Sequence, residues 1–197
     1  VANSDASVNL PSGGGTFTAQ ITDGNVQVVT GTTVVFSSGV EDLQSLTILG
    51  TGSAETVNLD ASLGTFTGPV GVSLMGGNDS LNSSAVGFGV LFNAGNDDDT
   101  FTGGSGNDTV LAGSGNDIVN SGAGNDVIEL GTGDDQADAG AGNDSVQGQA
   151  GNDAISGGAD DDLLNGNAGA DIILGGTGND RILGGSGQDD LNGEDGD

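Results

Sequence analysis

The sequence predicts an all-β protein that coils as a solenoid of short parallel strands, with a small antiparallel cap at its N-terminal end. Two observations predict this fold class. Residues 94 to 192 divide without a gap into eleven nine-residue units, each with a Gly-rich turn and one apolar residue in phase. Before them, residues 16 to 36 form short alternating runs separated by turn residues. A fixed short period is typical of solenoids, whose units bury an apolar face only by stacking.

The first 44 residues are interpreted as a lead and a β-hairpin cap. Residues 1–15 end in a Pro-Ser-Gly-Gly-Gly run, which is typical of a flexible linker. Asp23-Gly24 then separates two alternating runs and predicts a hairpin, and a third run covers Thr32 to Phe36. A small sheet of this kind would cover the open end of the coil, as solenoids require.

Residues 45–93 are predicted to form irregular β-helix rungs, so that the coil begins near residue 45. Strand-like runs recur there at wider and uneven spacing. These rungs are expected to bind no metal, with one exception: Asp79 follows a Gly-Gly-Asn turn and resembles a ligand. Glu55 and Asp60 are expected to be solvated.

Residues 94–197 carry the repeats, and numbering each unit from one to nine shows four regular positions. Position two is Gly in nine of the eleven units, and so, in a different set of nine, is position four; Gly permits the positive φ angles of tight turns. Position eight is always apolar, so a strand of about three residues is expected to turn only that side chain inward. Position six is Asp in every unit: Asp99, Asp108, Asp117, Asp126, Asp135, Asp144, Asp153, Asp162, Asp171, Asp180 and Asp189.

The Asp positions predict a row of cations along each edge of the coil. If two units complete one turn, alternate Asp residues stack on the same edge about 4.8 Å apart, where their charges repel unless a cation lies between them. Ca²⁺ fits because it accepts six to eight oxygen ligands, including backbone carbonyls, whereas Mg²⁺ prefers an octahedral shell rich in water. The sequence has no Cys and no His, which disfavours zinc and soft metals. Four gaps on one edge and five on the other predict about nine ions, with more at the ends.

The composition predicts that folding depends on these ions. The 197 residues include 29 acidic residues and one basic residue, for a formal net charge of −28. Such a chain with few aromatic residues is typically disordered. Nine Ca²⁺ ions would add +18 to −28 and leave about −10, so we expect folding coupled to calcium binding. The same charge excludes nucleic acid as a direct partner, and the sequence predicts no membrane insertion.

The repeat pattern resembles GGxGxDxUx, the nonapeptide of the RTX (repeats-in-toxin) β-roll family. The resemblance implies a right-handed parallel β-roll with two rows of Ca²⁺ between stacked turns, bound by the Asp side chains and by turn carbonyls. Gln149 and Asn167 depart from the pattern at position two, and Asp97 and Asp160 depart at position four. The glycines whose turns would supply carbonyl ligands are Gly104, Gly106, Gly113, Gly115, Gly122, Gly124, Gly131, Gly133, Gly140, Gly142, Gly151, Gly158, Gly169, Gly176 and Gly178.

The predicted function is structural. The chain contains no His and no Lys for a nucleophile–base pair, so no enzymatic activity is predicted. Low-affinity calcium modules belong where calcium is millimolar, which favours a secreted or cell-surface location. The chain is therefore interpreted as a surface-layer, adhesin or matrix component. Its partners would be glycan or matrix bound through calcium, or further copies joined end to end at the incomplete unit from residue 193.

Two other functions stay open. The chain resembles the RTX appendages of larger secreted enzymes or toxins, which assist export and folding. A polysaccharide-binding or polysaccharide-processing β-helix is the third hypothesis, although the chain has few aromatic residues for stacking on sugars.

Overall fold

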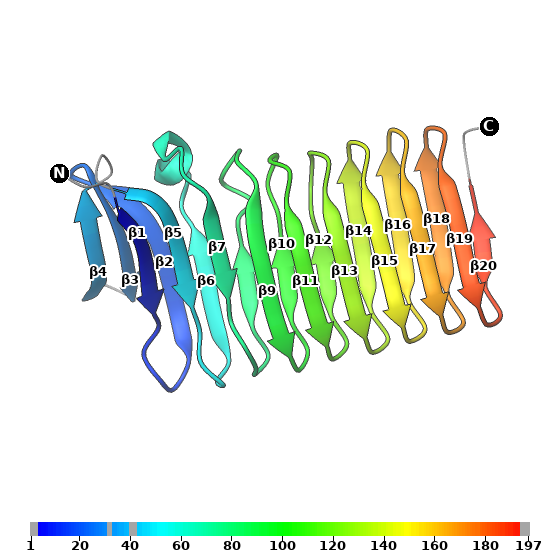
Figure 1. The fold of residues 1–197 in the computed structure, drawn as a ribbon, viewed down its shortest axis with the longest axis horizontal. Coiled ribbons are helices and arrows are strands. Elements are labelled where there is room, and N and C mark those ends of the chain that lie inside the picture. The colour runs from blue at the N-terminus through cyan, green and yellow to red at the C-terminus, as the bar shows by residue number, and fades with distance from the viewer. Residues whose placement is uncertain (1–3, 31–32, 40–42, 194–197) are drawn as a thin grey trace.

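In the computed structural model, two β-sheets face each other along an elongated rod, with the N- and C-terminal ends of the chain at its opposite ends (Figure 1). The structure describes residues 4–30, 33–39 and 43–193. Thr32, the first residue of the predicted third run, therefore lies outside the described residues. The incomplete last unit also lies outside them, except for Gly193. The predicted all-β parallel solenoid is confirmed.

The strands are divided between two sheets, here called sheet A and sheet B. Sheet A contains, in spatial order, β1 (Ser4–Asn9), β5 (Leu43–Leu49), β7 (Val70–Ser73), β9 (Val90–Asn96), β11 (Thr109–Ser114), β13 (Val127–Thr132), β15 (Ser145–Ala150), β17 (Leu163–Ala168) and β19 (Arg181–Ser186). Sheet B contains β20 (Asp190–Asn192), β18 (Ile172–Thr177), β16 (Ala154–Ala159), β14 (Gln136–Ala141), β12 (Ile118–Asn120), β10 (Thr100–Thr102), β8 (Ser80–Asn82), β6 (Glu55–Leu59), β2 (Gly15–Thr22), β3 (Asn25–Thr30) and β4 (Thr33–Gly39). A short 3₁₀ helix, η2 (Ala61–Thr65), follows β6.

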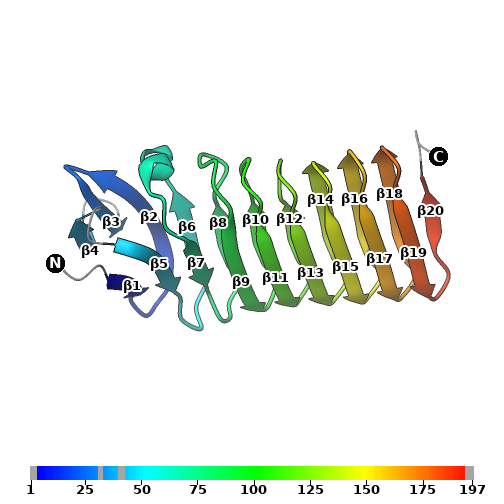
Figure 2. The same cartoon turned by 45° about the horizontal axis from the view of Figure 1, so that its top comes forward.

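Successive units alternate between the two sheets, so two units make one turn of the coil. Val110 of β11 pairs in parallel with Ile128 of β13, and Ile128 pairs with Val146 of β15. Each step advances by two nine-residue units. Figure 2 shows the resulting stack of strands running from the cyan rungs to the red C-terminal strand.

The strands of the repeats are longer than the sequence predicted. Most cover six residues, from position seven of one unit to position three of the next, where a strand of about three was expected. As a result a second position faces inward: position one, which is buried at Ala94, Ala112, Leu130 and Ala139. The expectation that only position eight faces inward is wrong, because extended backbone beyond position nine returns the next alternate side chain to the core.

The coil also begins earlier than the predicted residue 45. Strand β1 pairs in parallel with β5, and β2 pairs in parallel with β6, so residues 4–9 are a strand rather than a flexible lead. The predicted hairpin forms: β2 and β3 are antiparallel around Asp23 and Gly24, and β4 continues the sheet. Val26 and Val28 of β3 are fully buried and join the core at its N-terminal end. The division at residues 44 and 93 stays a prediction.

The core changes character along the rod. Its N-terminal part contains large side chains such as Phe17, Leu46, Ile48 and Leu63, all nearly inaccessible. The rings of Phe92 and Phe101 stack with centroids 5.5 Å apart where the repeats begin. Beyond Leu130 the side chains at position one shrink, and from Gly148 onward every unit has Gly there.

Candidate metal centre

The position-six Asp residues form two columns, one on each edge of the coil, as the repeat period predicts. Each backbone N–H of one Asp donates to the Oδ1 atom of the Asp one full turn later; Asp99 donates to Asp117, and Asp108 to Asp126. These hydrogen bonds are 2.7 to 3.1 Å long throughout both columns. Edge one contains Asp79, Asp99, Asp117, Asp135, Asp153, Asp171 and Asp189, and edge two contains Asp108, Asp126, Asp144, Asp162 and Asp180.

The second oxygen of nearly every column carboxylate is buried without a hydrogen-bond partner. Asp108 and Asp135 are each 1 % exposed, yet their Oδ2 atoms contact no donor. An isolated buried carboxylate oxygen is costly, so this arrangement calls for a bound cation or a proton. The affected atoms are Oδ2 of Asp79, Asp99, Asp108, Asp117, Asp126, Asp135, Asp144, Asp153, Asp162, Asp171 and Asp180.

The backbone of the turns surrounds these oxygens closely. A Cβ atom added to Gly175, at position one, would lie 2.4 Å from the Oδ2 atom of Asp180. At position two, a Cβ on Gly131 would lie 2.0 Å from the carbonyl oxygen of Gly113 in the previous turn. The carbonyls at position two therefore point toward the next turn, and those of Gly104 and Gly122 accept a backbone N–H there. A cation between rungs would have to share such oxygens with the Asp carboxylates.

The units that lack Gly keep the turn conformation. Asp97 and Asp160 at position four, and Gln149 and Asn167 at position two, have φ angles between 69° and 77°. Asn and Asp tolerate this left-handed region better than most residues. The four departures from the repeat pattern consequently do not interrupt the stack of turns.

A second ladder of side chains runs along the turns at position five, and sequence reasoning missed its role. The side-chain oxygen of Asn107 accepts the backbone N–H of Asn125 one turn later, at 3.0 Å. Asn116 accepts the N–H of Asp134 in the same way, at 2.8 Å. The detectable signal is the recurrence of Asn or Asp at position five, which occurs in nine of the eleven units.

Asp79 lies within edge one, as expected from its Gly-Gly-Asn turn. Its N–H donates to Asp99 Oδ1 at 2.7 Å, and Met75 and Gly77 have the positive φ angles of positions two and four. Glu55 was expected to be solvated, but it is 1 % exposed at the head of the same column. Its carboxylate accepts hydrogen bonds from the N–H and hydroxyl of Thr51, which satisfies it locally.

Asp60 is exposed, as expected, and caps η2 by accepting the N–H of Ser62. Arg181 stands at position seven and is exposed. Neither residue contributes to a column.

Burial raises the pKa of nine column carboxyls above the ordinary value for Asp, and backbone N–H donors oppose this effect only in part. The nine are Asp79, Asp99, Asp108, Asp117, Asp126, Asp135, Asp144, Asp153 and Asp162. The pKa rises to about 7 for Asp99 and Asp144 and to about 6 for Asp135 and Asp153, with neighbouring carboxylates adding to the increase. Carboxyls with such pKa values exist partly protonated near neutral pH unless a cation stabilises their charge.

The arrangement fits an ion held by mixed ligands. Among residues 4–30, 33–39 and 43–193, no group of three or more acidic side chains is placed to hold a metal. A cation between rungs would therefore need backbone carbonyls in addition to the column carboxylates, which suits Ca²⁺.

Comparison with known families gives one match. Residues 93–128, 130–164 and 165–197, just over half of the chain, match the RTX calcium-binding nonapeptide repeat. No curated protein and no solved structure matches the chain.

Proposed function

Because the chain belongs to the RTX calcium-binding nonapeptide repeat family, we propose that this calcium-binding repeat module is an extracellular structural component that folds when calcium fills both columns. The buried, unpartnered Oδ2 atoms carry the proposal, since they leave the ion-free roll with a charge or protonation cost in nearly every rung. The roll is of a structural, non-catalytic type.

The residues proposed as ligands are the position-six Asp side chains, Asp79 included, together with carbonyls of the Gly-rich turns. When bound, Ca²⁺ would supply positive charge and accept several oxygens at once. The chain itself positions each Asp side chain, because Oδ1 accepts a hydrogen bond from the backbone N–H one turn earlier. The N–H of Asp117, for example, donates to Oδ1 of Asp135. That hydrogen bond fixes the carboxylate and leaves Oδ2 buried without a hydrogen-bond partner, available to a cation.

We propose a location outside the cell, where calcium is millimolar and a low-affinity module would be filled. Extracellular calcium modules typically have dissociation constants of about 10⁻⁴ to 10⁻³ M. A polyanion of net charge −28 would stay expanded at low calcium and become a stiff rod at millimolar calcium. Within its described ranges the chain contains no helix long and apolar enough to cross a bilayer. We propose further that the rod contacts glycan or matrix through calcium, or other copies of itself.

Circular dichroism of the chain in EGTA and during calcium titration tests this proposal. We expect strand content to rise cooperatively as calcium reaches the millimolar range, with magnesium at the same concentration as the control. Equal strand content in EGTA and in calcium would refute calcium-dependent folding.

A second candidate function is that of a folding appendage of a larger secreted enzyme or toxin. The same acid load favours it, because a chain that is expanded at low calcium passes through an export channel more readily than a folded rod. The reading frame on both sides of residues 1–197 distinguishes the two: an adjoining catalytic domain would favour the appendage.

A further inference from the structure

The charge of the repeats is concentrated on the two edges of the rod, and its broad faces are nearly neutral. Outward side chains of the strands occupy positions seven and nine of each unit. Only four of them in residues 94–192 are charged: Glu129, Asp138, Arg181 and Asp190. All other acidic residues of the repeats lie in the turns, which contain the two Asp columns.

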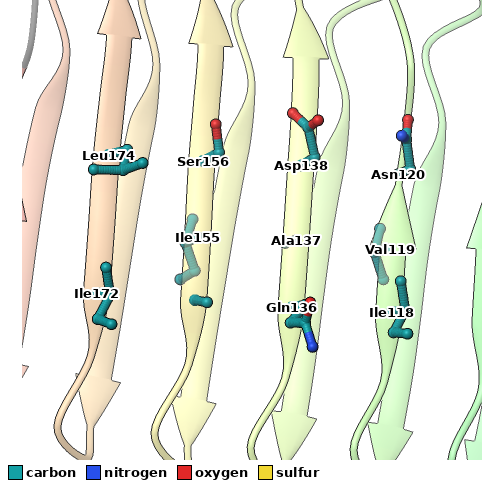
Figure 3. Close-up of a pocket in the computed structure, with 11 residues that line it drawn as sticks. Ile118, Val119, Asn120, Gln136, Ala137, Asp138, Ile155, Ser156, Ile172 and Leu174 are labelled. Atoms are coloured by element: carbon teal, nitrogen blue, oxygen red, sulfur yellow. The ribbon is translucent and has the colours of Figure 1, made fainter.

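The outer face of sheet B has a shallow apolar groove of about 270 Å³ (Figure 3). Ala154 and Ser156 of β16 are short and lie between Gln136 and Asp138 of β14 on one side and the longer side chains of β18 on the other. Those of β18 are Ile172, 53 % exposed, and Leu174, 37 % exposed. The groove is therefore aliphatic along the β18 wall. The opposite wall, from β12 and β14, combines the exposed Ile118 with polar side chains and the carboxylate of Asp138.

The outer face of sheet A has a comparable hollow of about 290 Å³. Leu163 and Leu183, each more than 40 % exposed, line it together with Arg181. Arg181 is the only basic residue of the chain, and its guanidinium has no hydrogen-bond or ion-pair partner among the described residues. One face thus presents leucines with a free cation, and the opposite face presents a groove with a carboxylate.

We propose that calcium-loaded copies of this chain stack face to face, sheet A of one copy against the sheet B groove of the next. Leu163 and Leu183 fill the groove along β16, and Arg181 pairs with Asp138 of the neighbouring copy. This inference rests on the proposed structural function and names its partner as a second copy. Because each copy uses two different faces, the contact is heterologous and builds an open stack.

Size and charge determine how strong such a contact can be. The five strands of sheet A that lie within the repeats, β11 to β19, at about 4.8 Å per strand and about 3.3 Å per residue, present a face on the order of 500 Å². A standard interface buries about 800 Å² on each partner, so each contact is weak and strongly concentration-dependent. The uncompensated charge lies on the edges, where a Debye length of about 8 Å at physiological salt screens it.

Charge reversal tests the pairing directly. Arg181→Glu and Asp138→Arg should each weaken association at least tenfold in sedimentation velocity at millimolar calcium, because each places like charges opposite one another. Mixing the two single variants should restore assembly, since each then offers the complement of the other. The matched control is the double variant, which has the same two residues exchanged within one chain and should associate like the unaltered chain.

Calcium uptake and circular dichroism of the same samples separate this inference from the proposed function. Folded, calcium-loaded chain that stays monomeric up to about a millimolar would overturn the stacking and leave calcium-dependent folding intact. Association that is unchanged by either single variant would also overturn it. Association lost in the single variants but not restored in the mixture would show a different pairing of faces and would sink the proposed one.

Discussion

The rungs before residue 94 and the repeats after it share one backbone architecture but fill its interior differently. The early rungs bury Phe17, Leu46, Ile48 and Leu63, and Glu55, the buried acid at the head of edge one, accepts hydrogen bonds from Thr51. Asp79, in the next rung of that edge, already has an unpartnered Oδ2 atom, as the repeats do. Most repeats bury the apolar residue at position eight, add at most one further apolar side chain at position one, and bury an unpartnered carboxylate oxygen beside them. The first region is stabilised by apolar burial, whereas the second requires compensation of charge.

The difference implies that the N-terminal rungs template the repeats. A solenoid is stabilised by contacts between neighbouring rungs, so a folded end lowers the cost of adding the next rung. Strand β9, with Phe92 stacked on Phe101 of β10, provides the last surface of the apolar region. Calcium would then propagate order from residue 94 toward the C-terminal end.

Removing calcium should have the largest and most uneven effect. We expect residues 100–192 to lose nearly all amide protection in EGTA, while amides of β5, β6 and β7 stay protected, because only the repeats depend on cations. Hydrogen exchange followed by mass spectrometry measures both regions in one sample. Simultaneous loss of amide protection in both regions would mean that the apolar rungs do not stay folded without calcium.

Acid should replace calcium in the repeats. Burial raises the pKa of Asp99, Asp108 and Asp144 to about 7 in the fold, above the ordinary value of 3.8. Between pH 4 and 7 the folded state therefore binds more protons than the unfolded state, so stability falls as pH rises through that range. The calcium-free chain should show its highest strand content near pH 4 and lose it by pH 7.

Calcium reverses this dependence, because it binds the deprotonated carboxylates. Circular dichroism between pH 4 and 8, with EGTA or with calcium, measures both curves. Strand content independent of pH in EGTA would contradict the assignment of the buried carboxylates as the destabilising groups.

Core truncations should separate the two regions by how far their cost in stability depends on calcium. Leu46→Ala in an early rung should lower the free energy of unfolding by about 2–5 kcal/mol whether or not calcium is present. Ile155→Ala in a repeat should cost a similar amount, but excess calcium should offset part of it through binding to the folded state. Urea titrations at several calcium concentrations provide the measurement. If the stability of both variants depended equally on calcium, the early rungs and the repeats would not differ in how they are stabilised.

The repeat architecture could be predicted from sequence because its signals are local and periodic. Eleven Asp residues in phase with an apolar residue determine both the two-unit turn and the two columns. The inward position one was missed because Leu130, Ala139 and Gly148 share no residue type there. The early start of the coil was missed because β1 and β5 pair across an intervening hairpin, and no period in the sequence marks that return.

Glu55 shows a third kind of limit. Its neighbourhood in sequence gave no sign that it would stand one rung before Asp79, since the segment between them contains η2 and spans more than the repeat period. Only the fold shows that Glu55 is the first acid of edge one and that its carboxylate accepts a hydrogen bond from Thr51. The first carboxylate of that edge with an unpartnered oxygen is therefore Asp79.

Replacing Asp79 should produce the smallest effect and locate the boundary between the two regions most finely. In Asp79→Asn the amide oxygen can still accept the N–H of Glu55, now 2.7 Å from Asp79 Oδ1, so the rung keeps its hydrogen bond and loses only a charge. We expect one fewer bound calcium ion and little change in strand content, measured by equilibrium dialysis and circular dichroism. Asp60→Asn, an exposed acid outside the columns, is the matched control and should leave the stoichiometry unchanged. If both variants bind as much calcium as the unaltered chain, the ion row begins at Asp99 and the apolar rungs contribute no ligand. A loss confined to Asp79→Asn would instead mean that the calcium row extends one rung into the apolar region, so the two modes of stabilisation overlap at the rung that joins them.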